Sequence, residues 1–135
     1  MQESAFLFGR FLSLADLLHL QYCVVRRDND VPPQLLGNQH YAMAGLNPAG
    51  ALALLGDRLR VYKAWADTDR SGRAALAKWA TARMGEMAEE LAVNLPRKAM
   101  TDREKAEMLL GYVMRDKKTE TVDVDQENKN NDTAN

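Results

Sequence analysis

The sequence has little cysteine and no long apolar run, and both absences narrow what the protein can be. Its 135 residues include one cysteine, Cys23, which excludes an internal disulfide and a zinc site built from several cysteines. No uninterrupted apolar stretch reaches the roughly 18 residues of a membrane-spanning helix. The first residues carry no basic cluster ahead of an apolar segment, so no secretory signal is predicted there. We therefore expect one cytoplasmic domain with no membrane partner.

Patterns typical of enzymes and cofactor sites are also missing. The two histidines, His19 and His40, have no HxxxH or ExxH spacing around them, and such spacing is what places two metal ligands on one helix face. The small-residue segment 45–56 lacks the lysine of a phosphate-binding loop. Cys23 lies in an apolar stretch, which favours a buried structural thiol. We interpret each histidine as a polar residue at the edge of the core or as a packed side chain, and not as a metal ligand. The sequence predicts no catalysis, cofactor, metal or small-molecule substrate; an enzyme that uses Cys23 or His40 is a minor alternative.

Charge is nearly balanced overall but unevenly distributed. Residues 119–135 hold five acidic residues and one basic residue out of totals of 19 and 18, so residues 1–118 carry 14 acidic and 17 basic residues, a net charge of +3. The tail, 119–135, has too few apolar residues to offset the entropy of ordering and is predicted to be disordered. It is either an inert terminus or a mask for a basic face. A body at +3 falls well short of an autonomous nucleic-acid binder, but it is compatible with weak backbone contacts inside a larger assembly.

The body, residues 1–118, is predicted to be a single all-α bundle of about five helices. Apolar residues recur at spacings of three and four, the period of an α-helix, and no segment of the body alternates convincingly with a period of two. The predicted helices are residues 3–27, 34–44, 47–67, 73–93 and a last helix that begins after residue 101. Arg26 and Arg27 are placed in the last turn of the first helix, where cations suit the helix dipole.

Two helix starts carry specific capping signals. Asn47 followed by Pro48 is typical of an N-cap with proline at the first helical position. Thr101 and Glu104 have the spacing of a capping box. The apolar residues of the last helix are Ala106, Leu109, Leu110, Val113 and Met114. Four methionines are expected to fill the core, with a groove for a partner as the alternative: Met84, Met87, Met108 and Met114.

Basic residues that follow the small-residue segment are the main functional candidates. Arg60 and Lys63 are three positions apart in the predicted helix 47–67, and Ala53 and Gly56 precede them on the same side. We expect this thin, basic flank to lie opposite the leucines of that helix, where small residues let another backbone approach and the cations bind phosphates. The residues predicted to contact nucleic acid are Arg26, Arg27, Asn38, Arg58, Arg60, Lys63, Arg73 and Lys78. Scattered surface charge is the alternative.

Three segments occur in an order that resembles a known family. They are FLFGRFLSLADLLHLQ at 6–21, GNQHYAMAGLNPAGALALLGDRLRVY at 37–62 and EKAEMLLGYVMRD at 104–116. They are similar to the C-terminal helical region of the large subunit of type I-C CRISPR effector complexes. The matching motifs are Phe8-Gly9-Arg10, Asn38 to Tyr41, Gly45 to Leu55, and Leu110-Gly111-Tyr112. Val113 stands where the family has a second tyrosine, and Asn38-Gln39-His40 stands where it has Asn-Ala-Thr.

The resemblance implies a non-catalytic small subunit of a type I surveillance complex (Cascade), because this region can occur there as a separate polypeptide. Several copies would line the crRNA-bearing filament and support the target DNA R-loop, chiefly the displaced non-target strand. The implied partners are the Cascade backbone and large subunits, neighbouring copies of the chain, target DNA and, as a further candidate, the crRNA. Weak contacts in each copy would act together through effective concentration. The alternative is a helical protein–protein adaptor that does not touch nucleic acid.

Overall fold

The computed structural model describes residues 4–26 and 32–114. Within these ranges the chain forms six helices and no strand, so the all-α prediction is confirmed. The helices are α1 (Ser4–Val25), α2 (Leu36–Gln39), α3 (Tyr41–Leu46), α4 (Pro48–Thr68), α5 (Ala75–Asn94) and α6 (Asp102–Val113). The expected helix 34–44 is instead two short helices, α2 and α3, divided at His40. Arg27 and the tail, 119–135, lie outside the described residues.

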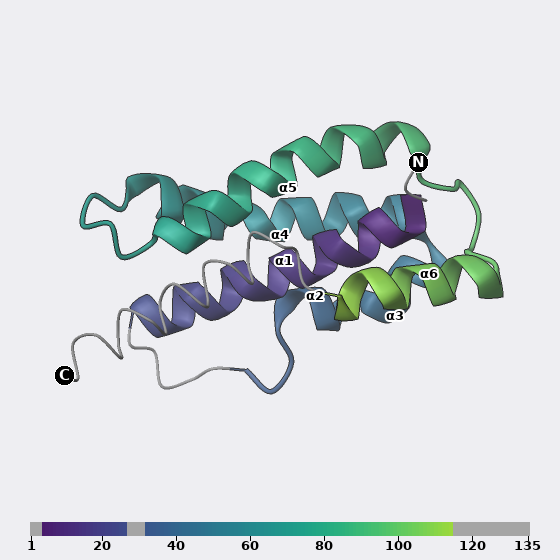
Figure 1. Ribbon diagram of the computed structural model, residues 1–135, viewed down its shortest axis with the longest axis horizontal. Helices are drawn as coiled ribbons and strands as arrows, with labels where there is room; N and C mark the ends of the chain where they lie inside the picture. The colour runs from purple at the N-terminus through teal and green to yellow at the C-terminus, as the bar shows by residue number, and fades with distance from the viewer. Residues whose placement is uncertain (1–3, 27–31, 115–135) are drawn as a thin grey trace.

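Helix α1 is the central element of the bundle. Figure 1 shows α1 running through the middle of the molecule, with α5 along one side, α6 along the other and α4 behind. Its side chains Phe8, Leu12 and Leu18 are fully or almost fully buried. A helix that is apolar on most sides belongs in a core. The length and apolar content of residues 4–25 therefore fix α1 at the centre, and the other helices pack around it.

Two glycines bring α1 and α6 into backbone contact. A Cβ atom built on Gly9 would lie 2.0 Å from the carbonyl oxygen of Met108 in α6. A Cβ built on Gly111 would lie 2.0 Å from the carbonyl oxygen of Phe6 in α1. Neither position has room for a side chain, because each glycine is seated against the backbone of the opposite helix.

The glycines of residues 37–60 serve different purposes. Gly37 packs against α1, with its would-be Cβ 2.0 Å from the carbonyl oxygen of Leu12. Gly50 leaves room for the Asn47 side chain, whose Oδ1 accepts a hydrogen bond from the Gly50 N–H at 3.2 Å. Gly56, in contrast, has no atom within 4 Å of a built Cβ. Within the described residues this segment therefore approaches another backbone closely at Gly37, against the chain's own α1. The approach of a second chain expected on the flank of Ala53 and Gly56 stays a prediction.

Both predicted capping signals are confirmed. Asn47 is the N-cap of α4, with Pro48 at its first position. At the start of α6 the Thr101 N–H donates to Glu104 Oε1 at 2.9 Å, and the Glu104 N–H donates to Thr101 Oγ1 at 3.2 Å. These bonds satisfy backbone groups that a helix end leaves without partners. They can be predicted from sequence because each joins residues only three positions apart.

Two helix ends lie about two residues from the predicted ones, and both concern candidate arginines. Helix α1 ends at Val25, so Arg26 lies in the turn after it and not in its last turn. Helix α5 begins at Ala75, so Arg73 lies in the turn before it. This turn is fixed by the Asp69 carboxylate, which accepts from the Ala74 N–H at 3.0 Å, and by Gly72 at φ 82°.

Helix α6 faces the core with a different side from the one its apolar pattern indicated. Met108 and Gly111 are buried, whereas four of its predicted apolar residues are 48–61% exposed: Leu109, Leu110, Val113 and Met114. The prediction that Met114 fills the core is therefore wrong, while Met84, Met87 and Met108 are buried as expected. The reason is steric. Only the face that carries Gly111 lets α6 approach α1 closely, and the bulky residues are left outside.

Candidate nucleic-acid interface

The basic residues of α4 divide between two flanks of the helix. Arg60 and Lys63, with Gly56, line a groove between α4 and α5. Leu59 lines the same groove, so the expectation that these cations lie opposite the leucines is wrong. Arg58 lies on the other flank, near Tyr62. Burial raises the pKa of the Tyr62 hydroxyl, and the charge of Arg58 opposes part of this rise.

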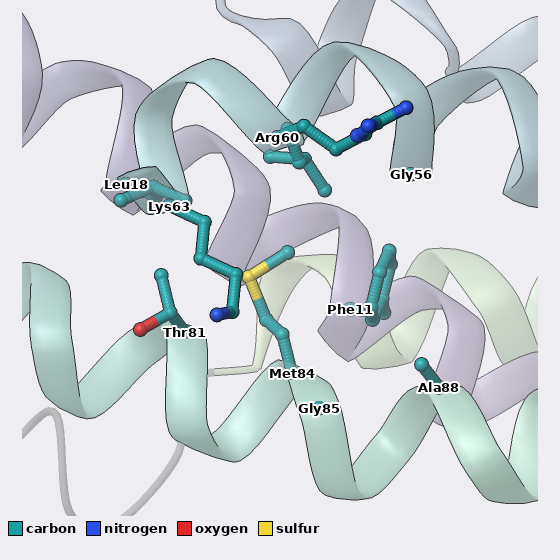
Figure 2. Close-up of a pocket in the computed structure, with 10 residues that line it drawn as sticks. Phe11, Leu18, Gly56, Arg60, Lys63, Thr81, Met84, Gly85 and Ala88 are labelled. Atoms are coloured by element: carbon teal, nitrogen blue, oxygen red, sulfur yellow. The ribbon is translucent and has the colours of Figure 1, made fainter. Parts of the chain in front are cut away.

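The groove between α4 and α5 has an apolar floor and a cationic rim. Phe11 and Leu18 of α1 form the floor, Met84 of α5 contributes to the wall, and the volume is about 150 Å³. Figure 2 shows the Lys63 amine reaching from α4 toward α5, while the Arg60 guanidinium points away from α5. Cationic charge on this flank therefore stands beside apolar surface.

Exposed ion pairs hold both rim cations. Arg60 NH1 lies 3.3 Å from Asp57 Oδ1, and Lys63 Nζ lies 3.0 Å from Asp67 Oδ2. The side chains of Arg60 and Lys63 are 80% and 62% exposed. Because exposed pairs of this kind contribute little, commonly about 0.2–1 kcal/mol, a phosphate can compete for both cations.

A second group of residues gathers where α1 and α4 end, and we call it the aromatic–basic cluster: Tyr22, Arg26, Arg58, Tyr62 and Trp65. The Tyr22 ring meets Tyr62 edge-on at 4.9 Å between centroids, and it meets Trp65 edge-on at 5.3 Å. The Arg26 guanidinium lies over the Tyr22 ring, 4.7 Å from its centroid, and also contacts the Tyr22 hydroxyl. The sequence predicted the two arginines but missed the aromatic residues, although the spacing of Tyr62 and Trp65 places them on one helix face.

Two of the other predicted side chains, and the backbone of a third residue, serve the chain's own structure. Arg73 donates to the carbonyl oxygen of Val25 at 2.9 Å, and Lys78 donates to the carbonyl oxygen of Asp69. Asn38 lies in α2, where its N–H donates to Asp16 Oδ1 at 3.0 Å. The structure thus places Arg26 beside Tyr22 and Arg58 near Tyr62 in one aromatic group, and it places Arg60 and Lys63 on the groove. It assigns the side chains of Arg73 and Lys78, and the backbone of Asn38, bonds that hold helix ends and connections.

The segments that carry the family resemblance meet at one point of the fold. Asp16 of α1 accepts a hydrogen bond from the Tyr112 hydroxyl of α6, in addition to the one from Asn38 of α2. Burial, then the bond to Asp16, raises the pKa of Tyr112 to about 12, so this phenol stays a donor at ordinary pH. Gly9 and Gly111 make the adjacent backbone contact. Residues of these segments therefore join α1, α2 and α6. The same segments also supply Phe11 and Leu18 to the groove and Tyr62 to the aromatic–basic cluster.

Cys23 is buried, as predicted, and both histidines are packed side chains, which is one of the two alternatives that the sequence left open. His19 Nδ1 accepts from the Leu36 N–H at 3.1 Å, and His40 Nδ1 lies 2.8 Å from the Leu36 carbonyl oxygen. Among residues 4–26 and 32–114, no three His, Cys, Asp or Glu side chains gather to hold a metal ion. Nor does any helix in those ranges have the length and apolar content needed to cross a membrane.

Protonation of His19 is expected to destabilise the fold as pH falls. Burial lowers the pKa of His19 below 6.5, with the nearby Asp16 carboxylate opposing the effect. The unfolded chain binds this proton at higher pH than the folded chain, so stability present above pH 6.5 is lost as pH falls through the folded pKa. Urea unfolding measured between about pH 7 and pH 5 checks this. The control is His19→Asn, which keeps an acceptor for Leu36 but does not titrate. Equal losses in the two proteins would contradict the prediction.

No family model, curated protein or solved structure matches the chain. The resemblance to CRISPR effector subunits therefore stays a prediction based on sequence motifs, and the geometry of the described residues is the remaining guide to function.

Proposed function

We propose that the chain is a non-catalytic small subunit of a type I CRISPR surveillance complex, in which it supports the displaced DNA strand of the R-loop through weak phosphate contacts. The observation that carries the proposal is the pair Arg60 and Lys63. Both are exposed beside an apolar groove, and each is held by an exposed ion pair. The order of the motifs around Gly9, Asn38 and Gly111 supports the proposed assignment to this family.

Weak binding by each copy is a requirement of this proposal. A body with a net charge of +3 has too few cations to hold DNA tightly alone, because affinity for the backbone grows with the number of phosphates neutralised. Copies arranged along one filament raise the effective concentration of each site for the same strand. The proposed contacts need no base readout, which suits a subunit that must accept any target sequence.

Reversing the groove charges is expected to weaken target-DNA binding by the assembled complex. Arg60→Glu combined with Lys63→Glu replaces two attractions with two repulsions, and we expect affinity to fall roughly tenfold or more at low salt. The measurement is DNA retention by purified crRNA-containing complexes at two salt concentrations. The difference should shrink as salt rises, because exposed charges are screened.

The matched control makes the same change of charge elsewhere. Lys98→Glu with Arg103→Glu alters two exposed residues near the start of α6, and we expect binding near the wild-type level. Undiminished DNA binding by the Arg60/Lys63 variant would contradict the phosphate-contact role. Failure of the wild-type chain to co-purify with a crRNA-containing complex would contradict the family assignment itself.

One observation favours a protein–protein adaptor as the second candidate. Leu109, Leu110 and Val113 lie on one side of α6 and are 48–61% exposed. An exposed apolar stripe of this kind is typical of a docking surface. The adaptor function predicts that charge reversal at Arg60 and Lys63 leaves both assembly and DNA binding unchanged, so the experiment above separates the two candidates.

A further inference from the structure

The aromatic–basic cluster has a layered arrangement that the phosphate-contact role does not require. The Arg26 guanidinium lies over the Tyr22 ring, and the rings of Tyr62 and Trp65 each meet Tyr22 at an interplanar angle of 82°. Arg26 is exposed, and Tyr22 is half-buried. The exposed Arg26 guanidinium therefore covers an aromatic group that is already assembled beneath it.

Such a stack has the chemistry of a platform for an unpaired base. Bases of single-stranded nucleic acid stack on aromatic rings and on the planes of arginine guanidinium groups. Arg58, exposed and close to Tyr62, provides a cation beside the platform. Val61 is 64% exposed and lies one helical turn before Trp65, which adds apolar surface on this flank of α4.

We propose that the aromatic–basic cluster binds one unpaired nucleobase, stacked on Arg26 over Tyr22, with Arg58 contacting a neighbouring phosphate. The inference rests on the proposed function and adds a base-stacking subsite to it. Duplex DNA does not fit the subsite, because a paired base has no face to offer. The subsite is sequence-tolerant, since stacking uses the face that every base has and not its hydrogen-bonding edge.

The experiment uses Trp65 as a reporter in the full chain. Trp79→Phe leaves Trp65 as the only tryptophan, since the chain contains two. A short oligothymidylate is titrated into this protein at low salt, and tryptophan fluorescence is followed. The comparison probes are an abasic oligonucleotide of the same length and a duplex of the same length. Of the three probes, we expect only oligothymidylate to give a saturable change in fluorescence. Its Kd should be about fivefold or more below that of the abasic strand.

Two variants test the residues of the platform. Arg26→Gln removes the guanidinium plane, and Tyr22→Leu removes the ring beneath it while keeping apolar volume. Both are expected to abolish the preference for oligothymidylate over the abasic strand. The matched control is Arg103→Gln, which removes one exposed positive charge from α6 and should keep the preference. Circular dichroism of each variant establishes that it is folded; if Tyr22→Leu does not fold, Arg26→Gln alone decides.

The outcomes separate this inference from the proposed function. Equal binding of oligothymidylate and the abasic strand, without a change in Trp65 fluorescence, overturns the stacking subsite and leaves phosphate contact standing. Tighter binding of the duplex than of the single strand also overturns the subsite. No binding of any probe by the full chain overturns the subsite, whereas the proposed function is decided by the charge-reversal experiment on the assembled complex.

Discussion

Replacing Gly9 with alanine is expected to be strongly destabilising. The new Cβ would lie 2.0 Å from the Met108 carbonyl oxygen and 2.7 Å from the Tyr112 backbone nitrogen. Backbone atoms of a packed helix cannot move aside as a flexible side chain can, so α1 and α6 must separate. Overpacked cores lose about 1–3 kcal/mol and sometimes more, and we expect Gly9→Ala to reach or exceed the upper end of that range. Gly111→Ala should behave in the same way, because it meets the Phe6 carbonyl oxygen at 2.0 Å.

The matched control is the same substitution at glycines that face open space. Gly56 in α4 and Gly85 in α5 have no atom within 4 Å of a built Cβ. Alanine there should stabilise the protein by about 0.5–1 kcal/mol, because glycine weakens a helix interior by that amount. Urea unfolding followed by circular dichroism measures all four variants. A Gly9→Ala protein as stable as Gly56→Ala would show that the two helices do not meet as described.

Removing the Asp16 carboxylate is expected to have the second large effect. Asp16 accepts from the Asn38 N–H and from the Tyr112 hydroxyl, so it connects α1 to both α2 and α6. Hydrogen bonds to a charged group contribute about 1.5–3 kcal/mol each, and a donor left without a partner adds a further cost. We expect Asp16→Ala to lower the free energy of unfolding by about 2–4 kcal/mol.

The control for Asp16→Ala is Tyr112→Phe. It keeps the ring that packs near Tyr41 at 5.2 Å between centroids and removes one donor. Its cost should be about 1 kcal/mol, well below that of Asp16→Ala, because Asp16 keeps its bond to Asn38. The midpoints of urea unfolding measure the loss of stability in each of the two variants. Equal losses in the two variants would mean that the Asn38 bond contributes nothing and that Asp16 does not connect three helices.

The candidate site was only partly predictable from sequence. Arg58, Arg60 and Lys63 were found because basic residues directly follow a segment of small residues. Their division between two flanks was not found, because positions around a helix acquire meaning only when its neighbours are placed. Tyr22 and Tyr62 are 40 positions apart in the chain, and no local pattern indicates that their rings meet. Arg73 and Lys78 look like ligand-binding cations in sequence, but they bind carbonyl oxygens of the chain itself.

The sequence alone determined that the described chain is helical and where α4 and α6 begin. Helical period and capping are local properties, set by side chains within one or two turns of each other. The tertiary structure alone decided which face of α6 is buried. The apolar pattern favoured Leu109, Leu110 and Val113, but Gly111 faces α1. The close contact between the backbones of α1 and α6 therefore decided the orientation of α6, and not the apolar area that burying the leucines would have contributed. Such an approach is possible only at the glycines of the two helices, Gly9 and Gly111.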